Sequence, residues 1–227
     1  NDYEDGELLV SKAKKIKASL IYLANPDNPM GTFHSRTVIE DVVANLPENA
    51  ILCLDEAYSE FVPKNELPRI NPENPQVIRM RTFSKGYGMA GARIGYAIGS
   101  NELIKSFDKI RNHFGINLLA QKAALVALED QEYLKSVISL VNESKQQIGE
   151  IVQACGLKPI PSLANFVAVD CGRDANYAKA VLDGLVKNQI FVRMPFVDPQ
   201  NRCIRISVGN QDDLKRLSLI LPKVLED

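Results

Sequence analysis

Short apolar runs that alternate with helical segments constrain the fold of this chain more than any other feature. The runs at residues 18–24 and 51–54 have the length and composition of buried strands, the alternating run at 77–82 fits a third strand, and residues 92–99 fit a fourth strand. Strands that alternate with helices predict an α/β layer with a mainly parallel sheet. Because the run at 18–24 is continuously apolar, we expect both of its faces to be covered.

Polar residues follow the first three runs. Asn28 lies in a proline-rich turn after the first run, Asp55 follows the second, and Lys85 follows the third. In open sheets of parallel strands, ligands bind beyond the carboxyl ends of the strands. We therefore expect these side chains to reach one rim of the sheet, and we interpret that rim as a binding site.

The stretch from residue 79 to residue 95, RMRTFSKGYGMAGARIG, has the composition of a phosphate site with a reactive amine. Lys85 is flanked by hydroxyls and by glycines, which let the backbone approach a ligand closely. Arg93 offers a planar fork that suits phosphate, and a neighbouring cation favours a neutral, nucleophilic amine. Pyridoxal phosphate needs both an amine for its Schiff base and a phosphate site. Taken alone, the stretch also fits a solvated lysine beside a helix-capping serine.

A pyridine-ring cofactor acts as an electron sink only while its ring nitrogen stays protonated, which takes a fixed carboxylate. Asp55 is placed for that role, and Tyr58 and Asn28 are placed to hydrogen-bond the phenolate oxygen of the ring. We expect Lys85 to form the Schiff base and to move the proton at the substrate Cα. The candidate phosphate ligands are Thr82, Ser84 and Arg93.

Each of these residues also has a purely structural explanation. Asp55 could cap the following turn, and Tyr58 could be an ordinary tyrosine at the edge of the core. Asn28 could satisfy its own turn, and Arg93 could form a surface ion pair. The occurrence of all the motifs in one order favours the cofactor interpretation.

In order along the chain, the motifs NPDNPMG, DEAY, SK followed by Arg93, and RCIRISVG resemble those of fold-type I, pyridoxal-phosphate-dependent aminotransferases of class I/II. The similarity is greatest to the histidinol-phosphate aminotransferases and their broad-specificity aromatic relatives. The resemblance implies an aspartate-aminotransferase-like large domain with a mainly parallel sheet, a smaller α+β C-terminal domain and a homodimer. It also implies transfer of an amino group between histidinol phosphate or an aromatic amino acid and 2-oxoglutarate or glutamate.

The same resemblance implies roles for individual residues. The matches to the family's cofactor contacts are Asn28, Asp55, Tyr58, Ser84, Lys85 and Arg93. Arg205 matches the arginine that binds the substrate α-carboxylate or its equivalent end, Arg193 matches a position facing the phosphate of histidinol phosphate, and Asn28 adjoins the substrate. Family members are longer at the N-terminus, where they carry a glycine-rich phosphate loop and further strands. We therefore expect this chain to be a C-terminal portion of such an enzyme.

Two other functions stay open at the level of the sequence. A decarboxylase or lyase of the same fold would use the same cofactor, because the reaction class depends on how the substrate is oriented at Cα. A non-catalytic ligand-sensing or scaffold domain would keep the fold without turnover. The presence of Lys85 argues against this second alternative.

Composition excludes several classes of function. The 27 basic and 28 acidic residues leave no positive excess for a nucleic acid, and no apolar run reaches the roughly 18 residues of a membrane span. We expect a cytoplasmic protein whose partners are a small amino acid and a 2-oxo acid. We expect reduced, buried thiols and no metal site, because the cysteines and histidines lack metal-ligand spacing; they are Cys53, Cys155, Cys171, Cys203, His34 and His113.

The change of pattern after residue 101 predicts the domain organisation. We expect residues 1–116 to be part of a large cofactor-binding domain, 117–150 a connecting helix, and 151–227 the smaller α+β domain. Residues 102–111 and 118–149 are expected to be helical and to form a long connecting helix pair, with little to break the second helix after Asn117. In the smaller domain we predict strands at 165–169, 190–194 and 203–208, with helices at 176–188 and from residue 212 onward.

Overall fold

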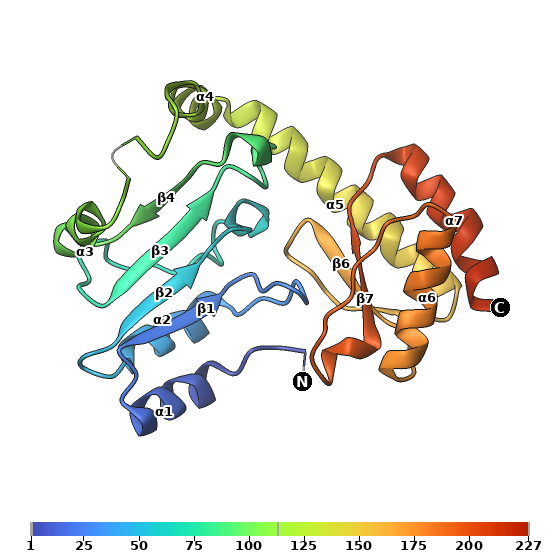
Figure 1. The fold of residues 1–227 in the computed structure, drawn as a ribbon, viewed down its shortest axis with the longest axis horizontal. Helices are drawn as coiled ribbons and strands as arrows, with labels where there is room; N and C mark the ends of the chain where they lie inside the picture. Colours follow the sequence, from blue (N-terminus) through green and yellow to red (C-terminus); the bar gives the residue numbers. More distant parts are fainter. Residues whose placement is uncertain (1, 113, 227) are drawn as a thin grey trace. The chain divides into compact units, whose positions relative to one another are not determined.

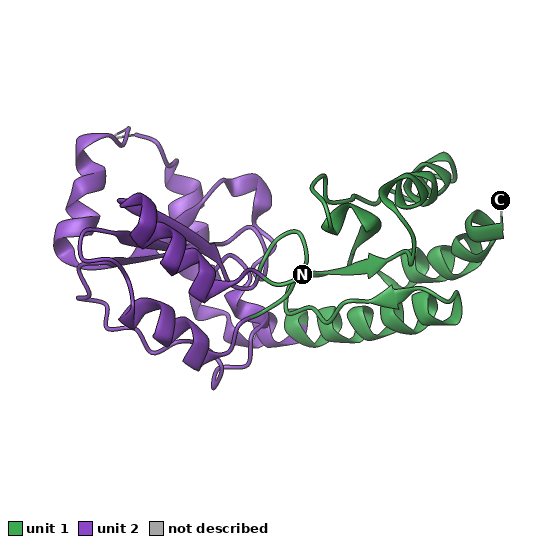
Figure 2. Ribbon diagram, turned by 90° about the horizontal axis from the view of Figure 1, so that it is seen from below, with its two compact units in different colours: residues 1–3, 27–33, 137–227 green, residues 4–26, 34–136 purple. Residues whose placement is uncertain are grey.

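The computed structural model describes residues 2–112 and 114–226, so His113 lies outside the described residues. The chain forms two compact units, coloured separately in Figure 2. Unit 1 comprises the described residues of 1–3, 27–33 and 137–227, and unit 2 comprises residues 4–26 and 34–136. Each unit has its own sheet and its own core.

Unit 2 contains the predicted mainly parallel sheet (Figure 1). Its strands are β1 (Leu20–Ala24), β2 (Ile51–Asp55), β3 (Val77–Thr82) and β4 (Gly95–Ile98), hydrogen-bonded in that order. The first three strands are parallel, and β4 runs antiparallel to β3. The carboxyl ends of β1, β2 and β3 therefore meet at one edge, as the sequence predicted.

Helices α1 (Gly6–Ile16) and α2 (Arg36–Ala44) cover one face of this sheet. The N-cap of α1 is Asp5, whose side chain accepts a hydrogen bond from the Leu8 amide at 2.9 Å. The apolar sides of both helices pack on inward-pointing strand residues. This core includes Val10, Ala13, Ile21, Leu23, Ile39, Val42, Leu52 and Leu54.

The opposite face of β1 is open, so the expectation that this strand is covered on both faces is wrong for this chain. Alternate residues of a strand point to opposite faces. Ile21 and Leu23 are buried, whereas Leu20 and Tyr22 are 66% and 55% exposed. The apolar run identified a strand, but its composition did not show which face would find a partner.

Helical segments follow the sheet of unit 2. The predicted helix at 102–111 is shorter than expected: α3 (Asn101–Ser106) ends early and a 3₁₀ turn, η3 (Phe107–Lys109), follows it. The single helix expected at 118–149 is instead two helices, α4 (Leu118–Glu129) and α5 (Gln131–Ala154). Asp130 separates them, and its side chain accepts a hydrogen bond from the Tyr133 amide at 3.0 Å, which caps the start of α5.

Unit 1 is built on a three-stranded antiparallel sheet in the order β5-β6-β7. The strands are β5 (Lys158–Pro159), β6 (Phe166–Asp170) and β7 (Cys203–Ser207). Helices α6 (Ala175–Lys187) and α7 (Gln211–Glu226) lie beside this sheet in Figure 1. Their apolar sides join α5 in the core with Ile148, Val152, Val167, Val169, Val181, Leu185, Ile204, Leu214 and Leu217.

The predicted strand at 190–194 is wrong. Only Arg193 pairs with the sheet, through an isolated bridge to Arg205. The two backbone hydrogen bonds of this bridge measure 3.1 Å and 2.6 Å. Pro195 lacks an amide hydrogen, so it cannot extend the ladder by donating a further bond.

The structure bears on two expectations: that the cysteines are buried free thiols and that the chain has no membrane span. Cys171 and Cys203 are free and buried, whereas Cys53 and Cys155 are free but only half-buried. Burial raises the pKa of Cys171 to about 11 and that of Cys203 to about 12. Within residues 2–112 and 114–226, no helix has the length and apolar character needed to cross a bilayer.

Candidate functional site

Asp55 ends β2 with both carboxylate oxygens engaged. Oδ1 accepts a hydrogen bond from the Ala57 amide at 2.9 Å, and Oδ2 accepts one from the Tyr22 hydroxyl at 2.6 Å. Partial burial raises the pKa of Tyr22 above its ordinary value, and the bond to Asp55 raises it further. Tyr22 was not predicted from the sequence. Its pairing with Cys53, two residues before Asp55, follows only from the parallel register of β1 and β2.

The residue after Asp55 is also held tightly. Glu56 is only 1% exposed and accepts hydrogen bonds from the side chains of Arg79 and Arg81 on β3. Its amide donates to the Met80 carbonyl at 2.9 Å. Glu56 was not predicted from the sequence. The signal was the pair of arginines two residues apart on one strand, which places both on the same face.

Lys85 and Tyr58 come together in unit 2. The Lys85 Nζ lies 5.2 Å from the centroid of the Tyr58 ring, a cation–π distance. Tyr58 is buried and directly precedes the 3₁₀ turn η1 (Ser59–Phe61). The segment after Asp55 and the loop after β3 therefore bring two predicted catalytic residues into contact.

The loop that carries Lys85 is anchored on both sides. Thr82 Oγ1 accepts a hydrogen bond from the Ser84 amide at 3.1 Å and donates one to the Ile94 carbonyl at 3.4 Å. Phe83 is buried, with its ring centroid 5.1 Å from that of Tyr87. These contacts limit the freedom of Lys85, because the residues before and after it are fixed.

Arg93 follows the short 3₁₀ turn η2 (Ala90–Ala92) in a left-handed conformation, with φ of 52°. Its side chain is exposed, and Nη1 donates a hydrogen bond to the Ala90 carbonyl at 3.0 Å. A Cβ built on Gly88 or Gly91 would meet no atom within 4 Å. The backbone around Arg93 is thus open enough for an anion to approach.

Asn28, Arg193 and Arg205 belong to unit 1. The Arg205 guanidinium donates a hydrogen bond to Asn28 Oδ1 and stacks 4.7 Å from the Phe166 ring. Opposite residues of an antiparallel bridge point to the same side, so the Arg193 and Arg205 side chains emerge together. All the predicted residues of this unit line one hollow of about 620 Å³. Its other lining residues include Lys179, Leu182, Phe191, Met194 and Phe196.

The predicted residues thus fall into two groups, each within one unit. The group in unit 2 has an amine, a fixed carboxylate, a phenol, two hydroxyls and a guanidinium, which is the donor set that a phosphorylated pyridine aldehyde requires. The group in unit 1 has two arginines and an amide beside aromatic side chains. Such a set suits a ligand with an anionic end and an apolar or aromatic body.

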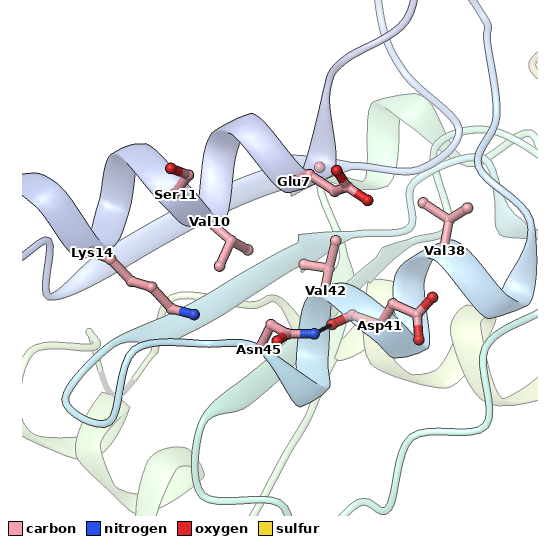
Figure 3. Close-up of a pocket in the computed structure, with 9 residues that line it drawn as sticks. Glu7, Val10, Ser11, Lys14, Val38, Asp41, Val42 and Asn45 are labelled. Atoms are coloured by element: carbon pink, nitrogen blue, oxygen red, sulfur yellow. Dashed lines mark hydrogen bonds between the residues drawn. The ribbon is translucent and has the colours of Figure 1, made fainter.

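A further hollow of about 490 Å³ lies in unit 2 between α1 and α2 (Figure 3). It carries charges of both signs, from Glu7, Lys14 and Asp41. No predicted site residue lines it, because these helices cover the sheet face opposite to Tyr22 and Asp55. Gly6 also lines this hollow, and a Cβ on it would lie 2.7 Å from a methyl carbon of Val42, so glycine permits the close approach of the helices.

The sequence profile described as aminotransferase class I and II matches residues 1–218. The chain belongs to this family. The class I and II resemblance inferred from the ordered motifs is therefore confirmed, and so is the fold class. Within the family, the chain is 38% identical over 215 residues to histidinol-phosphate aminotransferase 2 of Hydrogenovibrio crunogenus. It is 34% identical over 221 residues to histidinol-phosphate aminotransferase 2 of Carboxydothermus hydrogenoformans.

A solved family structure is similar over the whole chain. The histidinol-phosphate aminotransferase of Sinorhizobium meliloti, crystallised in complex with pyridoxal-5'-phosphate, is 48% identical with a TM-score of 0.97. The comparison covers 100% of this chain and 62% of that one. The alignments with the two curated relatives cover 92% and 96% of this chain. The chain spans only 56% and 60% of the lengths of those relatives.

Proposed function

We propose that this chain provides the lysine-bearing cofactor site and the substrate arginines of a pyridoxal-5'-phosphate-dependent aminotransferase. The observation that carries the proposal is the placement of Lys85 and Asp55 in unit 2. Lys85 lies against the Tyr58 ring, and each carboxylate oxygen of Asp55 accepts a hydrogen bond. The family membership of the chain and the cofactor in the similar S. meliloti structure support it. When bound, the cofactor supplies an electron sink for the substrate α-carbon.

The residues of unit 2 divide the work at the cofactor. Lys85 provides the amine that holds the cofactor aldehyde and later carries a proton to and from the substrate Cα. Asp55 holds the proton on the pyridine nitrogen, and Tyr58 donates to the phenolate oxygen. The phosphate is held by Thr82, Ser84 and Arg93, of which Thr82 and Ser84 are already fixed by the loop.

The residues of unit 1 select the substrate. Arg205 binds the α-carboxylate of an amino acid or the equivalent end of histidinol phosphate, because its guanidinium is oriented by Asn28 and by stacking on Phe166. The Arg193 side chain emerges on the same side as that of Arg205. With histidinol phosphate as the donor, Arg193 binds the phosphate; with an aromatic amino acid, the space beside Arg193 takes the aromatic side chain. The proposed donor is therefore histidinol phosphate or an aromatic amino acid, with 2-oxoglutarate and glutamate as the other pair.

The test begins with cofactor binding to the purified 227-residue chain. Adding pyridoxal phosphate should produce a visible absorption band in wild type. Lys85→Ala should abolish that band, whereas Lys64→Ala, a change at an exposed lysine, should not. A band that persists in Lys85→Ala would contradict the assigned role of Lys85.

Product analysis separates the reaction classes. Incubation of the loaded protein with histidinol phosphate and 2-oxoglutarate should yield glutamate. Release of ammonia instead would assign a lyase, and release of carbon dioxide from an aromatic or phosphorylated amino acid offered in place of histidinol phosphate would assign a decarboxylase. Cofactor binding without any product from any tested donor would overturn the enzymatic proposal and leave a ligand-binding domain.

We also propose that the protein works as a homodimer in the cytoplasm. Large apolar side chains on α4 are exposed, including Leu118 and Leu119, and such surface is commonly covered by another chain. The described cysteines are all free, which suits a reducing compartment. Light scattering during size-exclusion chromatography should give twice the chain mass, and cell fractionation should recover the protein with cytoplasmic markers.

A further inference from the structure

Tyr22 points its hydroxyl at the carboxylate that the proposed function assigns to the cofactor ring. The Tyr22 side chain lies on the sheet face opposite to α1 and α2, and its Oη is 2.6 Å from Asp55 Oδ2. Tyr22 is 55% exposed, so it is not a core residue whose main task is to fill space. The main contact of the Tyr22 side chain is therefore the hydrogen bond to Asp55 and not packing in the core.

The carboxylate of Asp55 is held from two directions. The Ala57 amide donates to Oδ1 at 2.9 Å, and the backbone of Asp55 is fixed by a 2.9 Å bond from the Asn25 amide to its carbonyl. Without the Tyr22 bond, the carboxylate would keep the Ala57 bond alone among the side-chain hydrogen bonds seen in the described residues, and it could turn about that oxygen. With it, the plane of the carboxylate is set before any ligand arrives.

We propose that Tyr22 is a positioning residue that fixes the Asp55 carboxylate for the cofactor's pyridine nitrogen. This inference rests on the proposed function. Its physical basis is preorganisation: a group that is already oriented loses less entropy and needs less rearrangement when it binds its partner. Each carboxylate oxygen has more than one acceptor direction, so the Tyr22 bond leaves Asp55 able to accept the pyridinium N–H.

The surroundings of Tyr22 keep its hydroxyl protonated. Partial burial is the first cause that raises the pKa of Tyr22, and the hydrogen bond and the negative charge of Asp55 follow. Cys53 from β2 and Glu4 from the segment before α1 add smaller contributions in the same direction. Tyr22 therefore remains a hydrogen-bond donor throughout the neutral and moderately alkaline range.

The test compares Tyr22→Phe with Tyr133→Phe, because the two tyrosines are 55% and 54% exposed and Tyr133 is not part of the proposed site. Tyr22→Phe should weaken binding of pyridoxal phosphate by about fivefold to tenfold, which is within the range expected for losing one hydrogen bond of ordinary net strength. Tyr133→Phe should change it by less than about twofold. In an Asp55→Asn background, Tyr22→Phe should have almost no further effect, because the two residues act as one unit.

A second readout needs no cofactor. In the unliganded chain, the Tyr22 resonance, assigned by its absence in Tyr22→Phe, should titrate above the ordinary tyrosine value. Asp55→Asn should move that midpoint back toward the ordinary value. An unchanged midpoint, or equal losses of affinity from Tyr22→Phe in both backgrounds, would overturn the inference while the proposed function stands. Equal cofactor affinity of wild type and Asp55→Asn would overturn the assigned role of Asp55 and this inference with it.

Discussion

Glu56 and Arg79 form a forked ion pair inside unit 2. Glu56 Oε1 accepts from Arg79 Nη2 at 2.7 Å, and Oε2 accepts from Arg79 Nε at 3.0 Å. Arg81 adds a 2.8 Å bond to the same Oε2. Since Glu56 directly follows Asp55 and precedes Tyr58 by two residues, this pair ties the segment that carries both proposed site residues to β3.

Glu56→Gln should destabilise the protein by about 3 kcal/mol or more, because removing one partner leaves buried guanidinium groups without their counter-charge. Urea unfolding followed by circular dichroism would measure the loss. Glu48→Gln is the matched control, since Glu48 is exposed, and it should change the free energy of unfolding by less than about 0.5 kcal/mol. Similar values for the two variants would show that the ion pair contributes nothing measurable.

Glu60→Gln should stabilise the protein at neutral pH. Burial raises the pKa of Glu60, and a backbone hydrogen bond and then the charge of Arg81 oppose the shift. Among the described residues, Glu60 Oε2 is a buried oxygen without a hydrogen-bond partner. A raised pKa means that the folded state binds the proton more tightly than the unfolded state. Stability therefore falls as pH rises from the ordinary glutamate value through the raised folded value.

The expected gain for Glu60→Gln is about 1 kcal/mol at pH 7, or a rise of roughly 2–4 °C in Tm, with little gain at pH 4. Thermal unfolding at both pH values would measure it. Glu73→Gln, a change at an exposed residue, should give no such difference. An equal effect of Glu60→Gln at pH 4 and pH 7 would show that Glu60 titrates normally.

Gly31→Ala should destabilise unit 1 for two separable reasons. Gly31 has φ of +75°, and an added Cβ would lie 2.3 Å from Ser162 Oγ and 2.9 Å from Ser162 Cβ. Gly172 has φ of +74° with no atom within 4 Å of the added Cβ, so Gly172→Ala isolates the conformational cost of about 1 kcal/mol. Gly31→Ala should cost about 2 kcal/mol more because of the steric overlap.

Denaturant unfolding of both glycine variants would measure this difference. Ser162→Gly combined with Gly31→Ala should recover part of the loss, because it removes both overlapping atoms. Equal destabilisation by Gly31→Ala and Gly172→Ala would mean that the Ser162 side chain moves aside without cost.

The sequence by itself determined the strands of unit 2, their mainly parallel arrangement and the positions of Asp55 and Lys85 at strand ends. These features follow from local patterns, because apolar runs of strand length bounded by turns leave few alternatives. The sequence also identified the family through motifs whose order is improbable by chance. It wrongly predicted a strand at 190–194, because the several apolar residues of that segment suggested a strand, whereas the segment forms a single bridge at Arg193.

Only the tertiary structure decided which side chains meet. The bond from Tyr22 to Asp55 depends on the register of β1 against β2, and the contacts of Glu56 depend on which face of β3 carries Arg79 and Arg81. The exposure of Leu20 and Tyr22 likewise depends on what packs on each face of β1. Residue patterns encode periodicity along one strand, whereas these contacts arise between strands that are distant in sequence. A shift of one residue in the pairing register would move every side chain of a strand to the opposite face of the sheet.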